Sequence, residues 1–292
     1  MSATPAESRA ALAALLRARL GEGPAADFLA EHAGDDVEAL RAAFGDLRRV
    51  VGARPLVASF QERETVKVPT AWGDLFLGRW TTDTAARVLL LSQAVQAAPA
   101  PFKALWQAYD LGDTETRVAA LHVLNFVEDS DEEAALEIIA DAGRTYLEQL
   151  MDAAWCGNPF TAAHLDDQQY RKAVLKGLFC GLDVSRFIGL EERADAELAQ
   201  SLCEFADERE AAGRPVPPAV WIVAARHPRP GLVARLIGRM EHPLPDERLV
   251  AARALANAAD PRTASFIDER LGRETDPRVL AALSLARAAA AC

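Results

Sequence analysis

The sequence predicts an all-α protein, an irregular α-solenoid of stacked helical hairpins that is most regular at its C-terminal end. Alanine and leucine, which favour helices, dominate the chain, and β-branched residues rarely alternate with polar ones. Near the C-terminus the pattern DERLVAARAL (246–255) recurs thirty residues later as DPRVLAALSL (276–285). This period suits a helical hairpin, which must stack on its neighbours to bury its apolar face.

Each copy of this pattern has an Asp, an Arg two residues later, two alanines and a leucine. The segment TETRVAALHVL (114–124) repeats part of it, with Arg117 seven residues before Leu124. The pattern resembles HEAT-type repeats, in which an Asp caps a helix and an Arg lies at its exposed start. The resemblance implies stacked helix pairs, and a non-repetitive helical bundle is the alternative.

Apolar periodicity predicts the helices, and capping residues, prolines and glycines mark their ends. Residues 53–80 differ, because they combine Val, Phe, Thr and Trp with two prolines and show little helical periodicity. We expect a long ordered connection there. The predicted helices cover residues 5–20, 24–33, 35–51, 82–97, 101–110, 114–127, 131–154 with a break near Gly143, 167–180, 194–213, 218–227, 230–240, 245–258, 261–272 and 276–290.

The charge of the chain argues against one large class of function. Its formal net charge is −11, whereas nucleic-acid binding needs clustered positive charge. No run of eighteen apolar residues exists, so we expect no transmembrane segment. The four cysteines (156, 180, 203 and 292) form no CxxC pair, which suits free thiols and predicts a bacterial cytoplasmic protein.

The densest polar stretch of the chain is CGNPFTAAHLDDQQYRKAVLKG (156–177). Pro159 disfavours helical geometry at the residue before it, and Gly157 suits a left-handed C-cap, so one helix ends there. Residues 159–165 can form a short turn of helix, and Asp166 or Asp167 caps the next helix. The polar side chains are therefore expected at a junction between two helices.

The same stretch also supports a chemical hypothesis. A Cys near a His can form a nucleophile pair, and a carboxylate on the same turn can orient the imidazole. The structural alternative is a buried thiol beside ordinary helix caps, and it stays open. The catalytic candidates are Cys156, His164 and Asp167, and the ligand-binding candidates are Asn158, Asp166, Gln168, Tyr170 and Arg171.

Signatures of common catalytic chemistry are missing, because the chain has no GxxxxGK[ST] loop, GxSxG elbow or HExxH motif. Asp166 and Asp167 with Tyr170 do form a DDxxY pattern, and a paired aspartate can hold magnesium against a diphosphate, as in all-helical isoprenoid enzymes. A second acidic element is required, and residues 128–133 are the one candidate. The sequence leaves the cofactor unknown, and a divalent metal at the two aspartates is an alternative that we do not favour.

Six segments carry a resemblance to a known family: RWTTDTAARVLLL (79–91), TETRVAALHVL (114–124), CGNPF (156–160), VLKGLF (174–179), FIGLEERADAELA (187–199) and ADEREAAGRPVP (206–217). Over about residues 80–221, the chain resembles the EboA family, bacterial proteins encoded in ebo (or edb) gene clusters. GRPVPP (213–218) is the strongest breaker inside the chain. We therefore expect N-terminal helices and an ordered connection (1–80), an EboA-like helical region (81–215) and HEAT-like repeats (216–292).

The resemblance implies a pathway context and no known reaction. The clusters of this family also encode a prenyltransferase-like enzyme, a hydrolase-like enzyme and a sugar-phosphate-cyclase-like enzyme, and they are linked to making or exporting a small metabolite. One hypothesis is a helical-repeat protein that binds a metabolite or a partner enzyme of the same cluster and catalyses nothing. The alternative is a small-molecule enzyme, metal-dependent or not, that acts on a prenyl- or cyclitol-type metabolite at a site around Cys156–Asp167.

Overall fold

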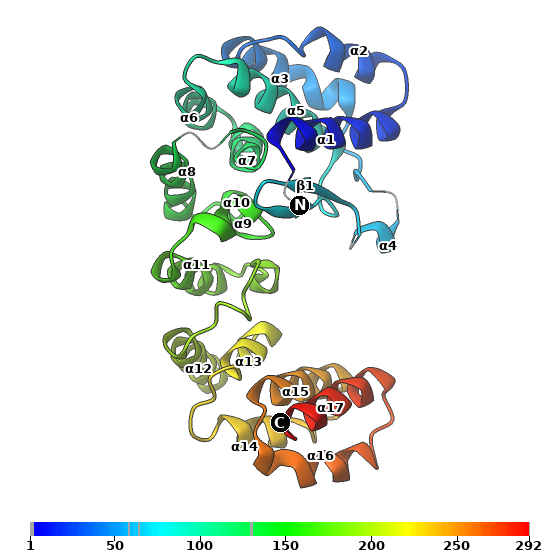
Figure 1. The fold of residues 1–292 in the computed structure, drawn as a ribbon, viewed down its shortest axis with the longest axis vertical. Coiled ribbons are helices and arrows are strands. Elements are labelled where there is room, and N and C mark those ends of the chain that lie inside the picture. The colour runs from blue at the N-terminus through cyan, green and yellow to red at the C-terminus, as the bar shows by residue number, and fades with distance from the viewer. Residues whose placement is uncertain (1–2, 58, 64, 129–130, 292) are drawn as a thin grey trace. The chain divides into compact units, whose positions relative to one another are not determined.

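The computed structural model describes residues 3–57, 59–63, 65–128 and 131–291. Most of these residues lie in helices, and the sheet found among them is one two-stranded antiparallel hairpin, which confirms the all-α prediction. The chain divides into two compact units, residues 1–188 and 189–292 (Figure 1). The three segments predicted from the sequence, with boundaries after residues 80 and 215, stay a prediction.

The first unit contains most of the elements. They are α1 (Pro5–Leu20), α2 (Pro24–Glu31), α3 (Val37–Val51), α4 (Phe60–Arg63), β1 (Lys67–Thr70), β2 (Gly73–Phe76), α5 (Thr82–Ala97), α6 (Pro101–Leu111), α7 (Thr114–Val123), α8 (Glu132–Arg144), α9 (Glu148–Trp155), α10 (Pro159–His164), α11 (Asp167–Cys180) and a 3-10 turn, η1 (Val184–Arg186).

Helix α5 is the centre of this unit. It packs against α1, α3, α6 and α7, and side chains around its whole circumference are buried, including Val88, Leu90 and Leu91. Each such side chain contributes about 1.5–3 kcal/mol by leaving water. Helix α7 packs in turn on α9, and α10 packs on α8, α9 and β2, so the polar stretch after α9 is tied to the core.

The hairpin of β1 and β2 lies inside the connection that the sequence left without strands. Val68 pairs with Leu75, both are buried, and α1 covers β1. The hydroxyl of Ser8 on α1 donates a hydrogen bond of 2.7 Å to the carbonyl of Pro69. Strands of four residues are too short for a recognisable alternating pattern, and a proline inside one argues against a strand, so sequence reasoning missed the hairpin.

The second unit contains α12 (Ala196–Ala211), α13 (Pro218–Ala224), α14 (Leu232–Arg239), α15 (Pro245–Ala258), the 3-10 turn η2 (Pro261–Thr263), α16 (Ala264–Leu271) and α17 (Pro277–Ala289). Helix α12 packs on α13, α13 on α15, and α15 on α17. These helix pairs match the ranges that the sequence predicted. Their arrangement as a solenoid stays a prediction.

The two copies of the repeat begin differently. Asp276 caps α17, as predicted, because its carboxylate accepts hydrogen bonds from the amides of Arg278 and Val279. Asp246 caps nothing: α15 begins one residue before it, and its carboxylate pairs with Arg278 at 2.9 Å. The prediction that each Asp caps its helix is therefore correct for the second copy and wrong for the first.

A buried ion cluster holds α15, α16 and α17 together. The carboxylate of Glu274 accepts two hydrogen bonds of 2.8 Å from Arg248 and one of 2.8 Å from Arg270. The amides of Thr275 and Asp276 also donate to it. The hydrogen bonds from Arg248 hold the pKa of the Glu274 carboxyl far below its usual range.

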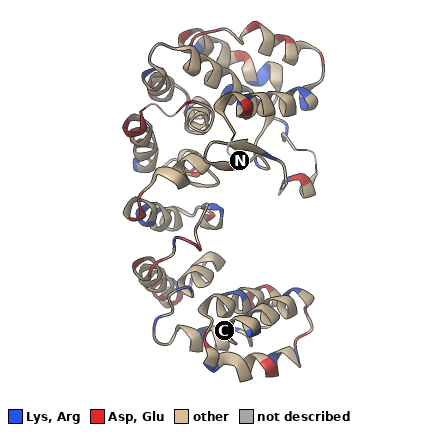
Figure 2. Cartoon of the chain, in the orientation of Figure 1, with Lys and Arg blue, Asp and Glu red and all other residues tan. Residues whose placement is uncertain are grey.

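Charge is spread over the molecule. In Figure 2, acidic and basic residues are interspersed along the helices of both units. Among the described residues, no helix has the length and apolar character needed to cross a membrane.

Candidate functional site

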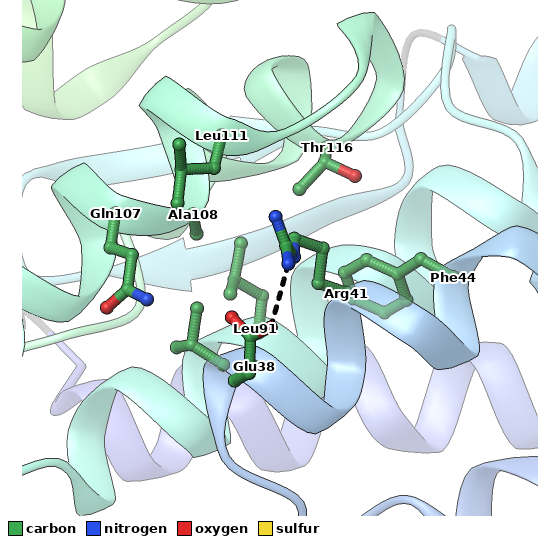
Figure 3. A pocket seen from close by; sticks show the side chains of 9 residues that line it. Glu38, Arg41, Phe44, Leu91, Gln107, Ala108, Leu111 and Thr116 are labelled. Carbon is green, nitrogen blue, oxygen red and sulfur yellow. Dashed lines mark hydrogen bonds and ion pairs between the residues drawn. The ribbon is translucent and has the colours of Figure 1, made fainter.

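Two hollows of very different size lie in the first unit. The smaller one is an apolar pocket between α3, α5, α6 and α7, where Arg41 pairs with Glu38 at 2.8 Å beside Gln107 and Leu111 (Figure 3). Its volume of about 10 Å³ leaves room for roughly one water molecule. This pocket cannot hold a metabolite.

The larger hollow has a volume of about 1190 Å³ and is open to solvent. Its lining comes from Arg63 at the end of α4, the end of β2 and the loop to α5, Thr84 on α5, helices α7 and α9, and residues 156–157, 183 and 185–188. We name it the α7–α9 groove. Ligand sites of enzymes and carriers typically measure a few hundred to about 1,000 Å³, so this groove is large enough for a metabolite.

Trp80 and His122 form one part of the groove wall. Their rings lie 4.6 Å apart, and only 7% of Trp80 and 9% of His122 are exposed. Burial lowers the pKa of the His122 imidazole to about 4, so the ring is neutral at neutral pH. Its Nδ1 atom is buried and has no hydrogen-bond partner among the described residues. An unsatisfied buried polar atom is uncommon in a native protein and calls for an explanation.

Charged pairs line another part of the wall. Asp152 on α9 pairs with Arg186, and the carbonyl of Arg186 accepts a 2.7 Å hydrogen bond from the amide of Gly157. Arg79 pairs with Asp183 at 3.4 Å. These two ion pairs therefore balance four of the charges in the groove wall.

Cys156 is the predicted catalytic candidate that lines this groove. Only 3% of the residue is exposed, and its thiol donates a long hydrogen bond of 3.8 Å to the carbonyl of Asp183. Burial, together with the nearby carboxylate of Asp152, raises the pKa of the thiol to about 12. The thiolate, not the thiol, is the nucleophile, so this environment suppresses the reactivity of Cys156 at neutral pH.

Asn158 is not among the described residues that line the groove. It caps α10, as the proline after it requires, and it is 1% exposed. Its Oδ1 accepts a 2.9 Å hydrogen bond from Asn125, and its Nδ2 donates at 2.9 Å to the carbonyl of Ala153. Asn125 in turn accepts from the amide of Phe160. This buried amide pair joins the end of α7 to the start of α10.

His164 ends α10 and packs into an aromatic cluster. Its Nδ1 lies 2.8 Å from the carbonyl of Phe160, and its ring stacks on that of Phe160 at 4.0 Å. The ring of Trp72, from the hairpin, meets the imidazole edge-on at 4.4 Å. These contacts give the histidine a packing role, and the described lining of the groove does not include it.

The other candidates belong to α11. Asp166 caps this helix through a capping box with Gln169, and Asp167 and Gln168 are exposed in its first turn. Tyr170 is 2% exposed and donates a 3.0 Å hydrogen bond to the carbonyl of Ile188. Arg171 is half-buried. None of these five candidates, Asp166 included, is among the described residues that line the groove.

We searched the described residues for side chains that could hold a metal ion. Among the described residues, no group of three or more His, Cys, Asp or Glu side chains is arranged to hold a metal ion. Asp166 and Asp167 act at a helix start, where carboxylates complement the helix dipole without a ligand.

Sequence reasoning missed Trp80, His122, Asp152 and Arg186. His122 offered a signal, since it interrupts an apolar segment of the predicted helix over 114–127. The remaining three offered none, because Trp80 comes from a loop and the Asp152–Arg186 pair joins residues thirty-four positions apart.

Comparison with known proteins identifies the family to which the chain belongs. A family model described as "Metabolite traffic protein EboA" matches residues 29–225, which include every residue that lines the groove. No curated protein and no solved structure matches the chain significantly. The matched range is well over half of the chain and contains the segments on which the resemblance rested, and the chain therefore belongs to the EboA family.

Proposed function

We propose that this protein binds a small metabolite in the α7–α9 groove and serves a small-metabolite biosynthesis or export pathway without catalysing a step itself. The observation that carries this proposal is the groove, which combines aromatic walls, paired charges and a volume of about 1190 Å³. The family description, metabolite traffic, supports the same role.

The alternative function is a small-molecule enzyme with its site around Cys156–Asp167. Two features of the structure favour binding over that alternative. The buried thiol of Cys156 has its pKa raised to about 12 and is therefore a poor nucleophile. The imidazole of His164 stacks on Phe160, meets Trp72 edge-on and is hydrogen-bonded to the backbone of its own helix.

The proposal extends to the setting of the protein. We expect it to act in the bacterial cytoplasm and to exchange its metabolite with enzymes of the same gene cluster. The helical pairs of the second unit, stacked as HEAT-like repeats, would offer those enzymes a surface to bind. Free thiols and the net negative charge are consistent with this setting.

Filling the groove tests the proposal. Val118 on α7 lines the groove and is half-buried, so Val118→Trp places a large ring inside it. Val250→Trp is the matched control, since Val250 is half-buried on α15 in the other unit. The native protein, purified from the organism that makes it, is denatured and the released small molecules are identified by mass spectrometry.

We expect a compound that is released from the wild type and from Val250→Trp but is absent from Val118→Trp. The same compound, added back to native protein, should be recovered chemically unchanged. Conversion of the compound to another mass would support the enzyme alternative. Equal recovery of the compound from all three proteins would refute the proposal that the groove binds this compound.

A further inference from the structure

The two copies of the C-terminal repeat differ in how far the same face of their helices is covered. Leu255 on α15 and Leu285 on α17 correspond in the thirty-residue repeat. Leu255 is 1% exposed, whereas Leu285 is 68% exposed. The contrast recurs at the two other positions of this face, which are the buried Ala251 and Ala254 on α15 and the exposed Ala281 and Ser284 on α17. The same face is therefore buried in one copy and in contact with solvent in the other.

Helices cover this face in the first copy. Helix α15 packs on α13, α14 and α17, whereas α17, the last helix that the structure describes, packs on α15 and α16 (Figure 1). A terminal repeat ordinarily presents a polar outer face to water, and α17 presents a leucine instead. We name the uncovered residues Ala281, Ser284 and Leu285 the α17 end face. Its counterpart on α15 indicates that this face fits the apolar side of another helix.

The polar groups around the α17 end face have partners within the chain. The Ser284 hydroxyl donates a 2.9 Å hydrogen bond to the backbone carbonyl one turn earlier in α17. Arg278 pairs with Asp246 at 2.9 Å, and Arg287 pairs with Asp268 at 2.7 Å. Both arginines beside the face therefore have counter-charges in their own chain, which favours an uncharged partner surface over a charged one.

The α17 end face is complementary to itself. Two α17 helices can pack antiparallel about a two-fold axis that is level with Leu283. Ala281 and Leu285 lie two residues on either side of that level, so Leu285 of each copy meets Ala281 of the other, a large side chain against a small one. A closed dimer requires such a patch that fills itself. We propose that the α17 end face joins two copies of this chain into an antiparallel, two-fold symmetric dimer.

Sedimentation equilibrium of the intact chain tests for the dimer. We expect the average mass to rise from that of one chain toward that of two across the micromolar range, because one helix pair buries less than the roughly 800 Å² per partner of a stable interface. Each copy carries a net charge of −11, so added salt screens the repulsion between copies and should tighten the dimer. Dissociation of the dimer by salt would overturn the apolar contact.

Leu285→Glu tests which surface joins the copies. The variant buries a carboxylate in the apolar contact, so it should raise the dissociation constant at least about tenfold. Because Leu285 is largely exposed, the melting temperature of the chain should stay close to that of the wild type. Leu244→Glu is the matched control, since Leu244 is also an exposed leucine of the second unit and lies outside α17. It should leave the dissociation constant unchanged.

A disulfide cross-link locates the two-fold axis. Ser284→Cys introduces a thiol within one residue of the level of the axis, so oxidation should join two copies through position 284. Peptide mass spectrometry identifies the linked peptides. Ser265→Cys, an exposed position on α16, is the control and should give no such link. This measurement decides the question if Leu285→Glu does not fold.

A chain that stays monomeric at every concentration would overturn the proposal. So would a dimer whose dissociation constant Leu285→Glu leaves unchanged, because the copies would then meet at another surface. If a different protein cross-links to Ser284→Cys while the chain alone stays monomeric, the face has another partner and the second copy is the wrong occupant. The proposed function is independent of these outcomes, since Val118→Trp tests it separately.

Discussion

Replacing Asn158 with alanine should destabilise the first unit far more than the loss of a helix cap explains. The side chain caps α10 through the amide of Thr161, accepts a hydrogen bond from Asn125 and donates one to Ala153. A lost cap costs about 1 kcal/mol, and each lost buried hydrogen bond about 1 kcal/mol more. The expected decrease in the free energy of unfolding is therefore about 3 kcal/mol.

A cap without further contacts provides the control. Asp36 caps α3 with one exposed hydrogen bond of 2.9 Å to the amide of Ala39. Asp36→Ala should cost about 1 kcal/mol. The difference of roughly 2 kcal/mol between Asp36→Ala and Asn158→Ala then measures the buried amide pair.

Urea unfolding is the assay, followed by circular dichroism and by tryptophan fluorescence. The two units can unfold separately, so the signals are compared before a two-state free energy is assigned. Four of the five tryptophans precede residue 189, and fluorescence therefore reports mainly on the first unit. A cost for Asn158→Ala no greater than that for Asp36→Ala would refute the reasoning and would restore Asn158 as a candidate for ligand binding.

Three further predictions follow from individual contacts. Burial raises the pKa of the Cys156 thiol to about 12, so iodoacetamide at pH 8 should label the half-buried Cys180 and spare Cys156 until urea is added. Peptide mass spectrometry reads the labelling, and labelled Cys156 in the native protein would contradict this prediction. Glu274→Gln should cost about 3 kcal/mol at pH 7, since it leaves the guanidinium of Arg248 without its counter-charge and leaves Arg270 with its ion pair to Glu241 at 3.6 Å. The folded-state pKa of the Glu274 carboxyl lies below its unfolded value of roughly 4.3, so its contribution is present above about pH 4 and is lost as the pH falls further; unfolding curves at pH 7 and pH 3 should therefore differ more for the wild type than for the variant. Gly78→Ala would place a Cβ 2.1 Å from the backbone carbonyl oxygen of Arg63 and should lower the free energy of unfolding by about 2 kcal/mol. The control is Gly45→Ala, whose Cβ meets nothing within 4 Å and which should stabilise α3 by up to about 1 kcal/mol. Similar melting temperatures for the two variants would show that the predicted clash at Gly78 is wrong.

Local chemistry explains why the helices were predictable from the sequence. The start of α11 illustrates this, because a carboxylate at Asp166 and an amide at Gln169 form a capping box that needs no other part of the chain. The break after α9 follows equally from Gly157, which takes φ +65°, and from the proline at 159. The hairpin of β1 and β2 escaped prediction because α1 and the core bury it, and short strands depend on such contacts.

The candidate site depended on the tertiary structure in the same way. The sequence predicted that Cys156, Asn158 and His164 lie at one junction. In the structure their surroundings differ: the thiol lies in the groove wall, the amide is hydrogen-bonded in a buried pair, and the imidazole packs in an aromatic cluster. Family membership was also readable from the sequence, since it rests on short segments and their order.

The sequence by itself determined the all-α class, most helix ends and the family, because each depends on neighbours along the chain or on residue identity. Only the tertiary structure brought Trp80 against His122 and Asp152 against Arg186, and thereby created the groove. The physical reason is that a groove is lined by residues that are distant in sequence. Burial, which neutralises His122 and protonates Cys156, exists only once those residues have met.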